Sequence, residues 1–339
     1  MPDNTEASGP HPARPEWFLA LAQYERPVVR EAVGQMLNTF LPYLALWGVM
    51  LFIVTHRYPY WVTLLLSLVA AGFLVRAFIF LHDCCHGSFF SSPRANTILG
   101  TLVGIMTMTP YTEWRWTHLL HHASFGNLDR RGLGDIRLMT VEEYLAASRM
   151  ARLSYRIYRH PLFLFPLGAP LLFTLVYRYP IAGAPPRERF NVWLTDGAIL
   201  ALIALACLTI GWRTLLLVQG PVLFFAWTFG VWMFYVQHQF PGVQWAHEAD
   251  WDFIRAALGG CSYYKLPRVL QWITGNIGLH HLHHLRPRIP NHRLQQAFDA
   301  TPAVQGVTPL TPLSSLQCLR LNVWDEQQHK LIGFSEIHS

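Results

Sequence analysis

The chain has 339 residues, of which 52% are hydrophobic and only 14% are charged, with a formal net charge of +6. Soluble globular proteins carry about 25% charged residues, so this composition argues against an ordinary soluble domain and indicates a protein embedded in a bilayer. The positive charge comes almost entirely from arginines beside apolar segments. This arrangement favours membrane lipid as a partner and argues against nucleic acid.

The first 35 residues are polar and contain prolines, and we expect them to form a cytoplasmic N-terminal segment. Four later runs approach the roughly 20 apolar residues that a membrane-spanning helix needs. These runs cover about 39–55, 60–81, 193–211 and 215–236. Because only a few residues join the members of each pair, each pair must form an antiparallel hairpin. The sequence therefore predicts an all-α integral membrane fold with four transmembrane helices in two hairpins.

Two further apolar runs are not predicted to cross the membrane. Residues 161–177 contain three prolines, which are costly inside a helix, and we interpret them as an interfacial or re-entrant segment. The run 97–109 is too short to cross. Residues 36–310 then form one membrane domain, with a cytoplasmic helical cap made of 82–159 and 237–310. Residues 311–339 are interpreted as a C-terminal tail.

Arginines set the predicted orientation. Seven lie between residues 130 and 159, whereas the two short links between the paired runs hold only Arg57 and Arg213. Cytoplasmic segments of membrane proteins are enriched in lysine and arginine. We therefore expect both termini and the cap on the cytoplasmic side of a membrane of the bacterial inner type.

The 17 histidines are strongly clustered. Nine of them form groups that follow the predicted spans: His82 and His86 in HDCCH, His118, His121 and His122 in HLLHH, His238 alone, and His280, His283 and His284 in HHLHH. On a helix, residues three or four apart share a face, so each group can direct its imidazoles to one point. Two separate hairpins deliver these groups to one membrane face, which predicts a metal site there.

The identity of the metal follows less directly. Sites made only of imidazoles suit zinc, copper, iron or nickel. Nine ligands are too many for one ion, so we expect two. The groups adjoin lipid, whose unactivated C–H bonds require an oxidant, and this favours two iron ions with O2 as co-substrate.

Several neighbouring residues are weaker candidates. Asp83 and Asn276 lie beside the groups, where each could contact a metal-binding histidine. The alternative for Asp83 is a solvated acid at a helix end, and for Asn276 it is a turn residue, which is slightly favoured. His281, the extra member of HHLHH, is expected to contact a metal-binding histidine or to be structural. Asp129 and Asp135 lie in NLDRRGLGDI, where turn formation is the favoured interpretation.

Four segments together resemble the membrane fatty acid desaturase family: HDCCHGSFF, HLLHHASFGNLDRRGLGDI, YVQHQF and GCSYYKLPRVLQWITGNIGLHHLHHLRPRIPNHRL. They look closest to the bacterial acyl-lipid branch, with omega-6 or delta-12 and delta-5 members. The resemblance implies a di-iron enzyme whose ligands are the nine histidines above, and O2-dependent removal of two hydrogens from an acyl chain. The HxxxH spacing of the first group implies a lipid-linked substrate. Because no HPGG haem-binding motif is present, it also implies a separate ferredoxin-like electron donor.

Other functions stay open at this point. The same metal centre could serve a lipid hydroxylase, a fatty acid decarboxylase that forms terminal alkenes, an acetylenase or a carotenoid oxygenase. A non-catalytic membrane metal-binding protein is a further alternative. A transporter, however, would need polar ligands near the bilayer midplane, whereas these groups follow the ends of the predicted spans.

Overall fold

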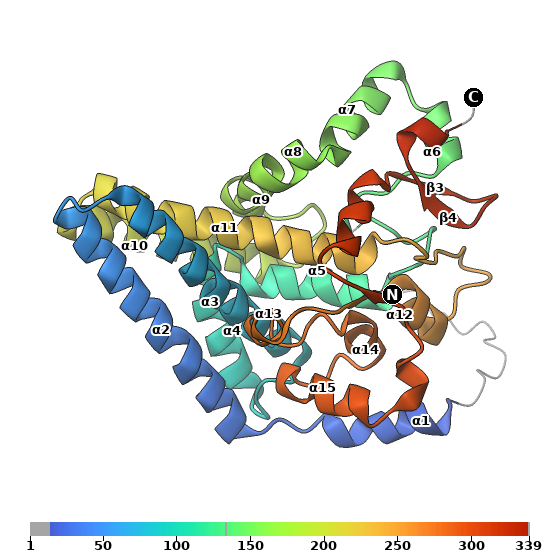
Figure 1. Ribbon diagram of the computed structural model, residues 1–339, viewed down its shortest axis with the longest axis horizontal. Helices are drawn as coiled ribbons and strands as arrows, with labels where there is room; N and C mark the ends of the chain where they lie inside the picture. The colour runs from blue at the N-terminus through green and yellow to red at the C-terminus, as the bar shows by residue number, and fades with distance from the viewer. Residues whose placement is uncertain (1–13, 133, 338–339) are drawn as a thin grey trace.

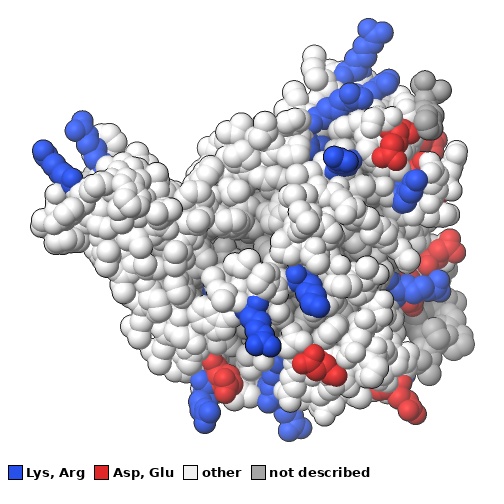
Figure 2. Space-filling model, in the orientation of Figure 1, with Lys and Arg blue, Asp and Glu red and all other residues white. Residues whose placement is uncertain are grey.

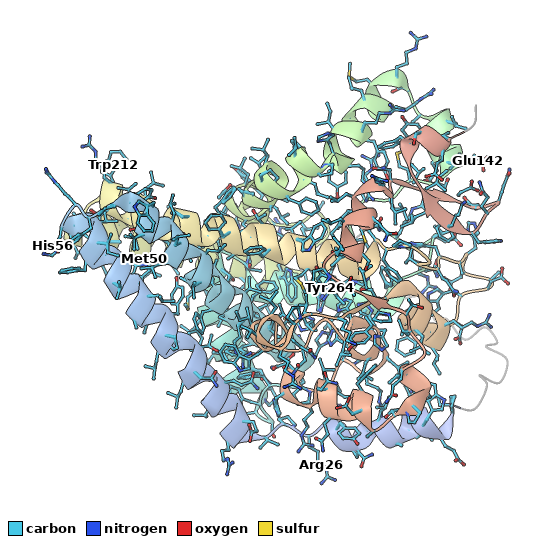
Figure 3. The ribbon with its side chains drawn as sticks, viewed as in Figure 1. Arg26, Met50, His56, Glu142, Trp212 and Tyr264 are labelled. Carbon is cyan, nitrogen blue, oxygen red and sulfur yellow. The ribbon has the colours of Figure 1, made fainter. Side chains whose placement is uncertain are left out.

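Two hairpins of long helices form one half of the molecule (Figure 1). A computed structural model describes residues 14–132 and 134–337. The long helices are α2 (Val29–Thr55), α3 (Tyr60–His86), α10 (Pro186–Thr209) and α11 (Trp212–His238). His56 and Trp212, which follow α2 and begin α11, lie together at the far end of the bundle (Figure 3). The two predicted hairpins are therefore present.

The helices extend beyond the apolar runs that predicted them. Helix α2 begins at Val29 and α3 continues to His86, where Gly87 ends it in the left-handed conformation at φ 67°. Left-handed backbone is favourable for glycine because it lacks a Cβ. As a consequence, HDCCH is the last turn of a long helix and its side chains have fixed directions.

A fifth stretch, Pro161–Arg178, is also long and apolar enough to cross a membrane. It is not one regular helix, since α8 (Pro161–Phe163), a π-helical turn (Leu164–Gly168), α9 (Ala169–Thr174) and a 3₁₀ turn follow one another. The coarse prediction of a mostly helical fold with several long apolar helices is confirmed.

Shorter helices continue the chain between the two hairpins. Helix α4 (Pro93–Thr107) packs against α3 and leads into α5 (Tyr111–Ser124). A Cβ at Gly100 would lie only 2.2 Å from the Tyr111 ring, so glycine is required for this close approach. Tyr111 donates a hydrogen bond to the Cys84 carbonyl at 2.9 Å. These contacts tie α5 to the end of α3.

The C-terminal third folds over the same end of the bundle (Figure 1). Strand β1 (Tyr263–Tyr264) pairs in parallel with β2 (Pro309–Leu310), and β3 (Val323–Asp325) pairs antiparallel with β4 (Lys330–Ile332). The remaining α-helices are α1 (Glu16–Ala20), α6 (Val141–Ala146), α7 (Arg149–Arg159), α12 (Phe253–Gly260), α13 (Arg268–Ile273), α14 (His280–Leu285) and α15 (Asn291–Asp299). Residues 311–337 thus carry the β3–β4 hairpin, and Trp324 within it is buried.

Charged side chains are distributed unevenly over the surface. Figure 2 shows few charged atoms on the bundle of long helices except at its tip, and many on the opposite half. Apolar side chains are exposed along the bundle, for example Leu44, Leu65 and Leu208. An apolar belt with charged ends is the surface that a bilayer requires.

Arg76 in α3 is a buried charge within a long apolar helix. It is only 4% exposed. Its guanidinium donates to Thr39 Oγ1 at 3.1 Å and to the Trp272 carbonyl, and it lies 4.0 Å from the Trp272 ring centroid. Internal hydrogen bonds and a cation–π contact replace the headgroup water that a snorkelling arginine would use.

Candidate metal centre

Four helices bring the nine histidines to one place. His82 and His86 lie in the last turn of α3, and His238 ends α11. The second group lies on one face of α5, and the third lies on α14. Since all four helices meet at the same end of the bundle, segments far apart in the sequence form one cluster.

The first set comprises five histidines from three helices. Their ligand nitrogens all lie within 4.8 Å of one another: His82, His86, His118, His122 and His283. The Nε2 atom of His118 is 3.0 Å from that of His86 and 3.2 Å from that of His122. The Nε2 atoms of His283 and His122 are 3.1 Å apart.

The second set adjoins the first. His121, His238 and His284 also have ligand nitrogens within 4.8 Å of one another. His238 Nε2 lies 3.1 Å from His121 Nε2 and 3.0 Å from His280 Nε2. The structure therefore brings all nine predicted histidines together, eight of them in two adjoining sets and His280 at the border of the second set.

The protonation of these imidazoles fits metal binding. Burial, followed by neighbouring imidazoles, lowers the pKa of His118, His122 and His283 well below its usual value. The same causes lower the pKa of His280 and His284. Nitrogens only 3.0–3.2 Å apart can serve as neighbouring ligands of one metal ion, because an imidazole nitrogen lies about 2.0–2.1 Å from a bound ion such as zinc. The donor set therefore fits two soft-to-borderline metal ions.

Asp135 orients one of these imidazoles. Its carboxylate oxygen Oδ1 lies 2.5 Å from His121 Nδ1, and both side chains are almost fully buried. A metal-binding histidine commonly donates its second ring N–H to a carboxylate, which fixes the tautomer. We favoured a turn role for Asp135 from the sequence. The structure instead places its carboxylate beside His121, one of the nine predicted ligands.

The loop before Asp135 is shaped to allow this contact. Gly134 has φ 81°, and a Cβ there would lie 2.9 Å from the Thr117 carbonyl and 3.1 Å from His121 Cβ. Only glycine permits the backbone to pass so close to α5. The GLGD sequence contained this signal, although its spacing could not show which helix it would approach.

The other candidate contact residues lie near the centre in different ways. Asp83 Oδ2 accepts hydrogen bonds from the backbone and side-chain nitrogens of Asn291, both at 2.8 Å. Its other oxygen is 3.6 Å from His82 Nδ1, beyond hydrogen-bond distance. Asn276 has φ 57°, and its side chain donates to the Asn291 carbonyl. Asp83 and Asn276 thus both fasten the segment that begins α15.

His281 points away from the two sets. Its Nε2 lies 3.0 Å from the Val304 carbonyl, and burial lowers its pKa to about 4. Its Nδ1 has no hydrogen-bond partner among the described residues. Although His281 stands in the middle of HHLHH, it lies on the opposite face of α14 from the centre.

Among the described residues, the aromatic rings of three side chains other than histidine contact the nine predicted ligand histidines. Trp114 stacks on His118 with ring centroids 4.4 Å apart and also contacts Phe78 in α3. Phe234 in α11 and Phe125 after α5 both contact His238 and His121. Two of these rings therefore border the side of the long helices, and Phe125 borders the other side.

Comparisons with known proteins agree with this geometry. The fatty acid desaturase family model matches residues 58–306. A fatty acid desaturase of Bacillus subtilis is 45% identical over 317 residues, which cover 94% of this chain and 90% of that protein. The chain belongs to the fatty acid desaturase family. The protein is therefore an oxidoreductase of the membrane fatty acid desaturase type, as the histidine groups predicted.

More distant relatives share the central part of the chain. A temperature-sensitive sn-2 acyl-lipid omega-3 desaturase (ferredoxin) of Arabidopsis thaliana is 27% identical over 239 residues, covering 65% of this chain and 52% of that protein. An oleoyl-12-hydroxylase of Ricinus communis is 24% identical over 239 residues, covering 64% and 59%. This chain spans little more than half the length of these two relatives.

Proposed function

We propose that the protein is an O2-dependent di-iron desaturase that introduces a C=C bond into a lipid-linked acyl chain with electrons from a separate ferredoxin-like donor. The single observation that carries the proposal is the pair of adjoining imidazole sets, one of five histidines and one of three that His280 borders. Each set has enough ligands for one ion of coordination number four to six. Two bound iron ions would supply the oxidation of C–H bonds with O2.

The protein's own residues would hold and orient this centre. Burial disfavours protonation of five of the nine histidines, so their lone pairs are available to a metal: His118, His122, His280, His283 and His284. Asp135 fixes the ring of His121, and Asn291 holds Asp83 beside the first set. Rigid helices on four sides limit movement of the ligands, which keeps the reacting carbons at a fixed distance.

The acyl chain would approach from the side of the long helices. Trp114 covers His118 there, and its ring centroid is 5.1 Å from that of Phe78 in α3. These rings provide an apolar border between the spans and the first histidine set. A chain in the hydrocarbon therefore has a shorter path to the centre than a water-soluble substrate would have.

The proposal includes the membrane topology. We infer that α2, α3, α10 and α11 cross the bilayer, with the histidines and both termini in the cytoplasm. The stretch Pro161–Arg178 is assigned to the interface, because the π-helical turn with Pro166 interrupts it. We also retain residues 36–310 as the membrane domain and 311–339 as a C-terminal segment.

Fatty acid profiling tests the function. A bacterial host that expresses the wild type should accumulate acids two mass units lighter than their saturated parents. His121→Ala should remove this product while the protein still inserts in the membrane. His56→Ala is the matched control, because His56 is exposed and lies at the far end of the bundle (Figure 3). Unchanged lipids in the wild-type strain, with iron bound, would contradict the proposal.

Hydroxylation is the second candidate, because one relative is named an oleoyl-12-hydroxylase. The two reactions differ in the mass of the product. A hydroxylase yields acids sixteen mass units heavier, whereas a decarboxylase yields a hydrocarbon one carbon shorter. The same profile therefore decides among these alternatives.

A further inference from the structure

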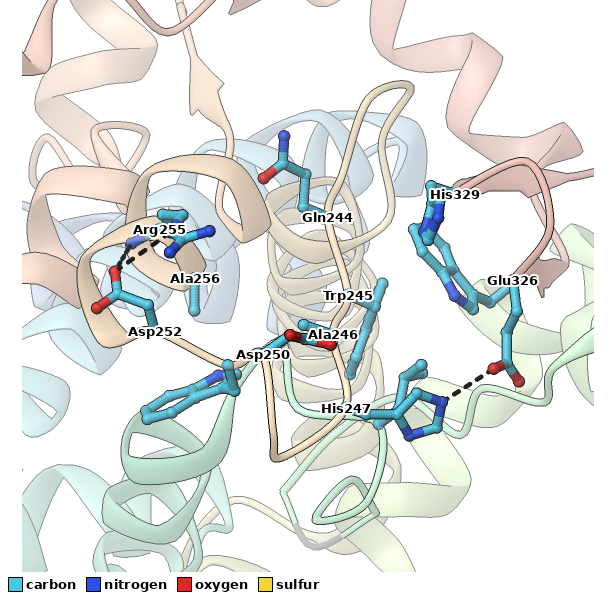
Figure 4. Close-up of a pocket in the computed structure, with 14 residues that line it drawn as sticks. Gln244, Trp245, Ala246, His247, Asp250, Asp252, Arg255, Ala256, Glu326 and His329 are labelled. Carbon is cyan, nitrogen blue, oxygen red and sulfur yellow. Dashed lines mark hydrogen bonds and ion pairs between the residues drawn. The ribbon is translucent and has the colours of Figure 1, made fainter. Parts of the chain in front are cut away.

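A pocket opens beside the metal centre on the side away from the tip of the bundle. Its volume is about 410 Å³, and it lies between α12, the loop 240–252 and the β3–β4 hairpin (Figure 4). Three tryptophans line it: Trp245, Trp251 and Trp324. Since it faces the charged half of the molecule, it is accessible to a soluble partner.

A single ring separates this pocket from the histidines. The Phe125 ring centroid is 5.2 Å from that of Trp245 on the pocket wall. On its other side it is 4.1 Å from His238, 5.2 Å from His121 and 5.4 Å from His284. Trp245 and Phe125 thus form a continuous aromatic path from the pocket to the second histidine set.

The position of Phe125 is enforced by its neighbours. Trp251 donates from its indole nitrogen to the Phe125 carbonyl at 3.0 Å. A Cβ at Gly260 would lie 2.8 Å from the Phe125 ring, so the glycine leaves just enough room for it. The contact between this ring and the histidines is therefore a property of the fold, not of one mobile side chain.

No comparable path from water was found among the described residues. The two other described rings that contact the ligand histidines, Trp114 and Phe234, border the long helices. Electron tunnelling weakens exponentially with distance, so a soluble donor needs a close approach on the water side. The pocket provides that approach.

The lining offers an exposed cation, Arg255, beside the wall that Trp245 forms. Trp245 is 6% exposed, and its indole nitrogen is buried, with no hydrogen-bond partner among the described residues. The Arg255 side chain is 81% exposed, and its nearest carboxylate contact is long at 3.9 Å. Two of the carboxylates are already engaged, since Asp252 caps α12 and Glu326 accepts from His247. Asp250 is the acidic lining residue with no recorded side-chain hydrogen bond.

We propose that a ferredoxin-type electron carrier docks in this pocket and that Trp245 and Phe125 carry its electron to the metal centre. A carboxylate of the carrier would pair with the exposed Arg255 guanidinium, and Asp250 would oppose it. The inference rests on the proposed function, because only a redox centre needs such a donor. A small contact area suits a transient electron-transfer complex.

The electrons balance in this scheme. Each docking event oxidises one reduced [2Fe–2S] cluster by one electron and reduces one ferric ion of the centre to the ferrous state. Two such events supply two electrons. With two protons and the two hydrogens removed from the acyl chain, they reduce O2 to two molecules of water.

The rival docking surface is the arginine face of α7. Arg149, Arg152 and Arg156 lie there and would attract an acidic carrier. However, among the described residues, no aromatic ring of α7 contacts one of the nine ligand histidines. A complex on this face would bind with a strong dependence on salt but would deliver its electron over a longer distance.

The test uses purified full-length protein in detergent and a plant-type [2Fe–2S] ferredoxin. Biolayer interferometry gives the Kd with metal-loaded and metal-free protein, so binding is read independently of activity. Arg255→Glu should raise the Kd about tenfold, as for a residue at the centre of an interface. Asp250→Asn should lower it, which a damaged fold would not do. Arg149→Glu, the matched charge reversal on α7, should leave it unchanged.

Stopped-flow mixing then separates docking from the electron path. Trp245→Phe keeps an aromatic ring at this position, so the transfer rate at saturation should stay near that of the wild type. Trp245→Leu removes the ring and should slow the transfer at saturation. A wild-type rate in Trp245→Leu overturns the electron path.

Two further results overturn the docking site: failure of the wild type to bind ferredoxin, and a larger effect from Arg149→Glu than from Arg255→Glu. A different result addresses the proposed function alone. If ferredoxin binds and reduces the centre through the pocket but host lipids stay saturated, the docking site stands and desaturation fails.

Discussion

Two histidine–carboxylate contacts in this protein differ mainly in burial. His121 and Asp135 meet at the centre, where their side chains are 1% and 6% exposed. His247 contacts Asp129 and Glu326 at the surface, where its side chain is 53% exposed. Water competes for the surface contact but not for the buried one, so similar chemistry has different consequences.

The comparison also separates two functions of histidine. In the centre, burial lowers the pKa of His118, His122 and His283, which favours the neutral imidazole that binds a metal. At the surface, both ring nitrogens of His247 lie near carboxylate oxygens, at 2.8 and 2.9 Å, which favours the charged form. A histidine of the centre is therefore suited to bind a metal, and His247 is suited to pair with carboxylates.

The largest expected effect tests which histidines belong to the centre. His283 and His281 stand two residues apart on α14, but only His283 lies in a histidine set. His283→Ala should remove a metal ligand and reduce desaturated product to background, with less iron per protein by mass spectrometry. His281→Ala should keep both. Equal iron content in the two variants would contradict the assignment of His283.

The second effect tests the carboxylate contacts directly. Asp135→Asn should reduce metal affinity or turnover about 10- to 100-fold, because residues that orient metal-binding histidines have effects of this size. Asp129→Asn removes a carboxylate from His247 instead and should leave turnover near that of the wild type. Iron retention during dialysis against a chelator gives the affinity, and lipid profiling gives the turnover. Similar losses in both variants would show that burial does not distinguish the two contacts.

The sequence was sufficient for the parts of the molecule that depend on local pattern. Hydrophobic runs predicted both hairpins, and helical spacing placed the imidazoles of each group on a common face. The family resemblance was also confirmed. The apolar runs and the histidine groups are patterns of consecutive residues, so they can be identified before any contact between distant segments is known.

Contacts between distant segments were harder to predict. His121 and His238 are 117 positions apart, and nothing in their spacing specifies a distance of 3.1 Å. The contact of Asp135 with His121 depends on how a glycine loop returns to α5. The burial of Trp324 depends on a hairpin that packs against a loop about 80 residues earlier, where its neighbours include Val243 and Trp245. The burial of Arg76 likewise depends on Trp272, which lies 196 positions further along the chain.

The third prediction concerns the loop that delivers Asp135. Gly134→Ala should place a Cβ against the Thr117 carbonyl and force an alanine into left-handed backbone, at a cost of roughly 1–3 kcal/mol. Gly132→Ala is the matched control, since Gly132 also has positive φ, at 127°, but open space around its Cβ position. The thermal midpoint by fluorescence-detected size-exclusion chromatography should fall further for Gly134→Ala, together with turnover. Equal falls would show that φ alone, and not the approach to α5, requires glycine there.

The smallest effect is the pH dependence of the surface contact. Hydrogen bonds to Glu326 and Asp129 raise the pKa of His247 above 6.5. The raised value means that the folded state holds the proton more tightly, so the contact stabilises the protein below about pH 6.5 and loses this effect as pH rises through the folded pKa. His247→Gln should therefore lower the thermal midpoint at pH 6 by about 2 °C or less, as exposed pairs contribute little. At pH 9 the variant and the wild type should unfold together. If the difference between the two thermal midpoints instead grew with pH, His247 would stabilise the protein through its neutral form. It would then resemble the buried histidines of the centre in protonation, despite its exposure.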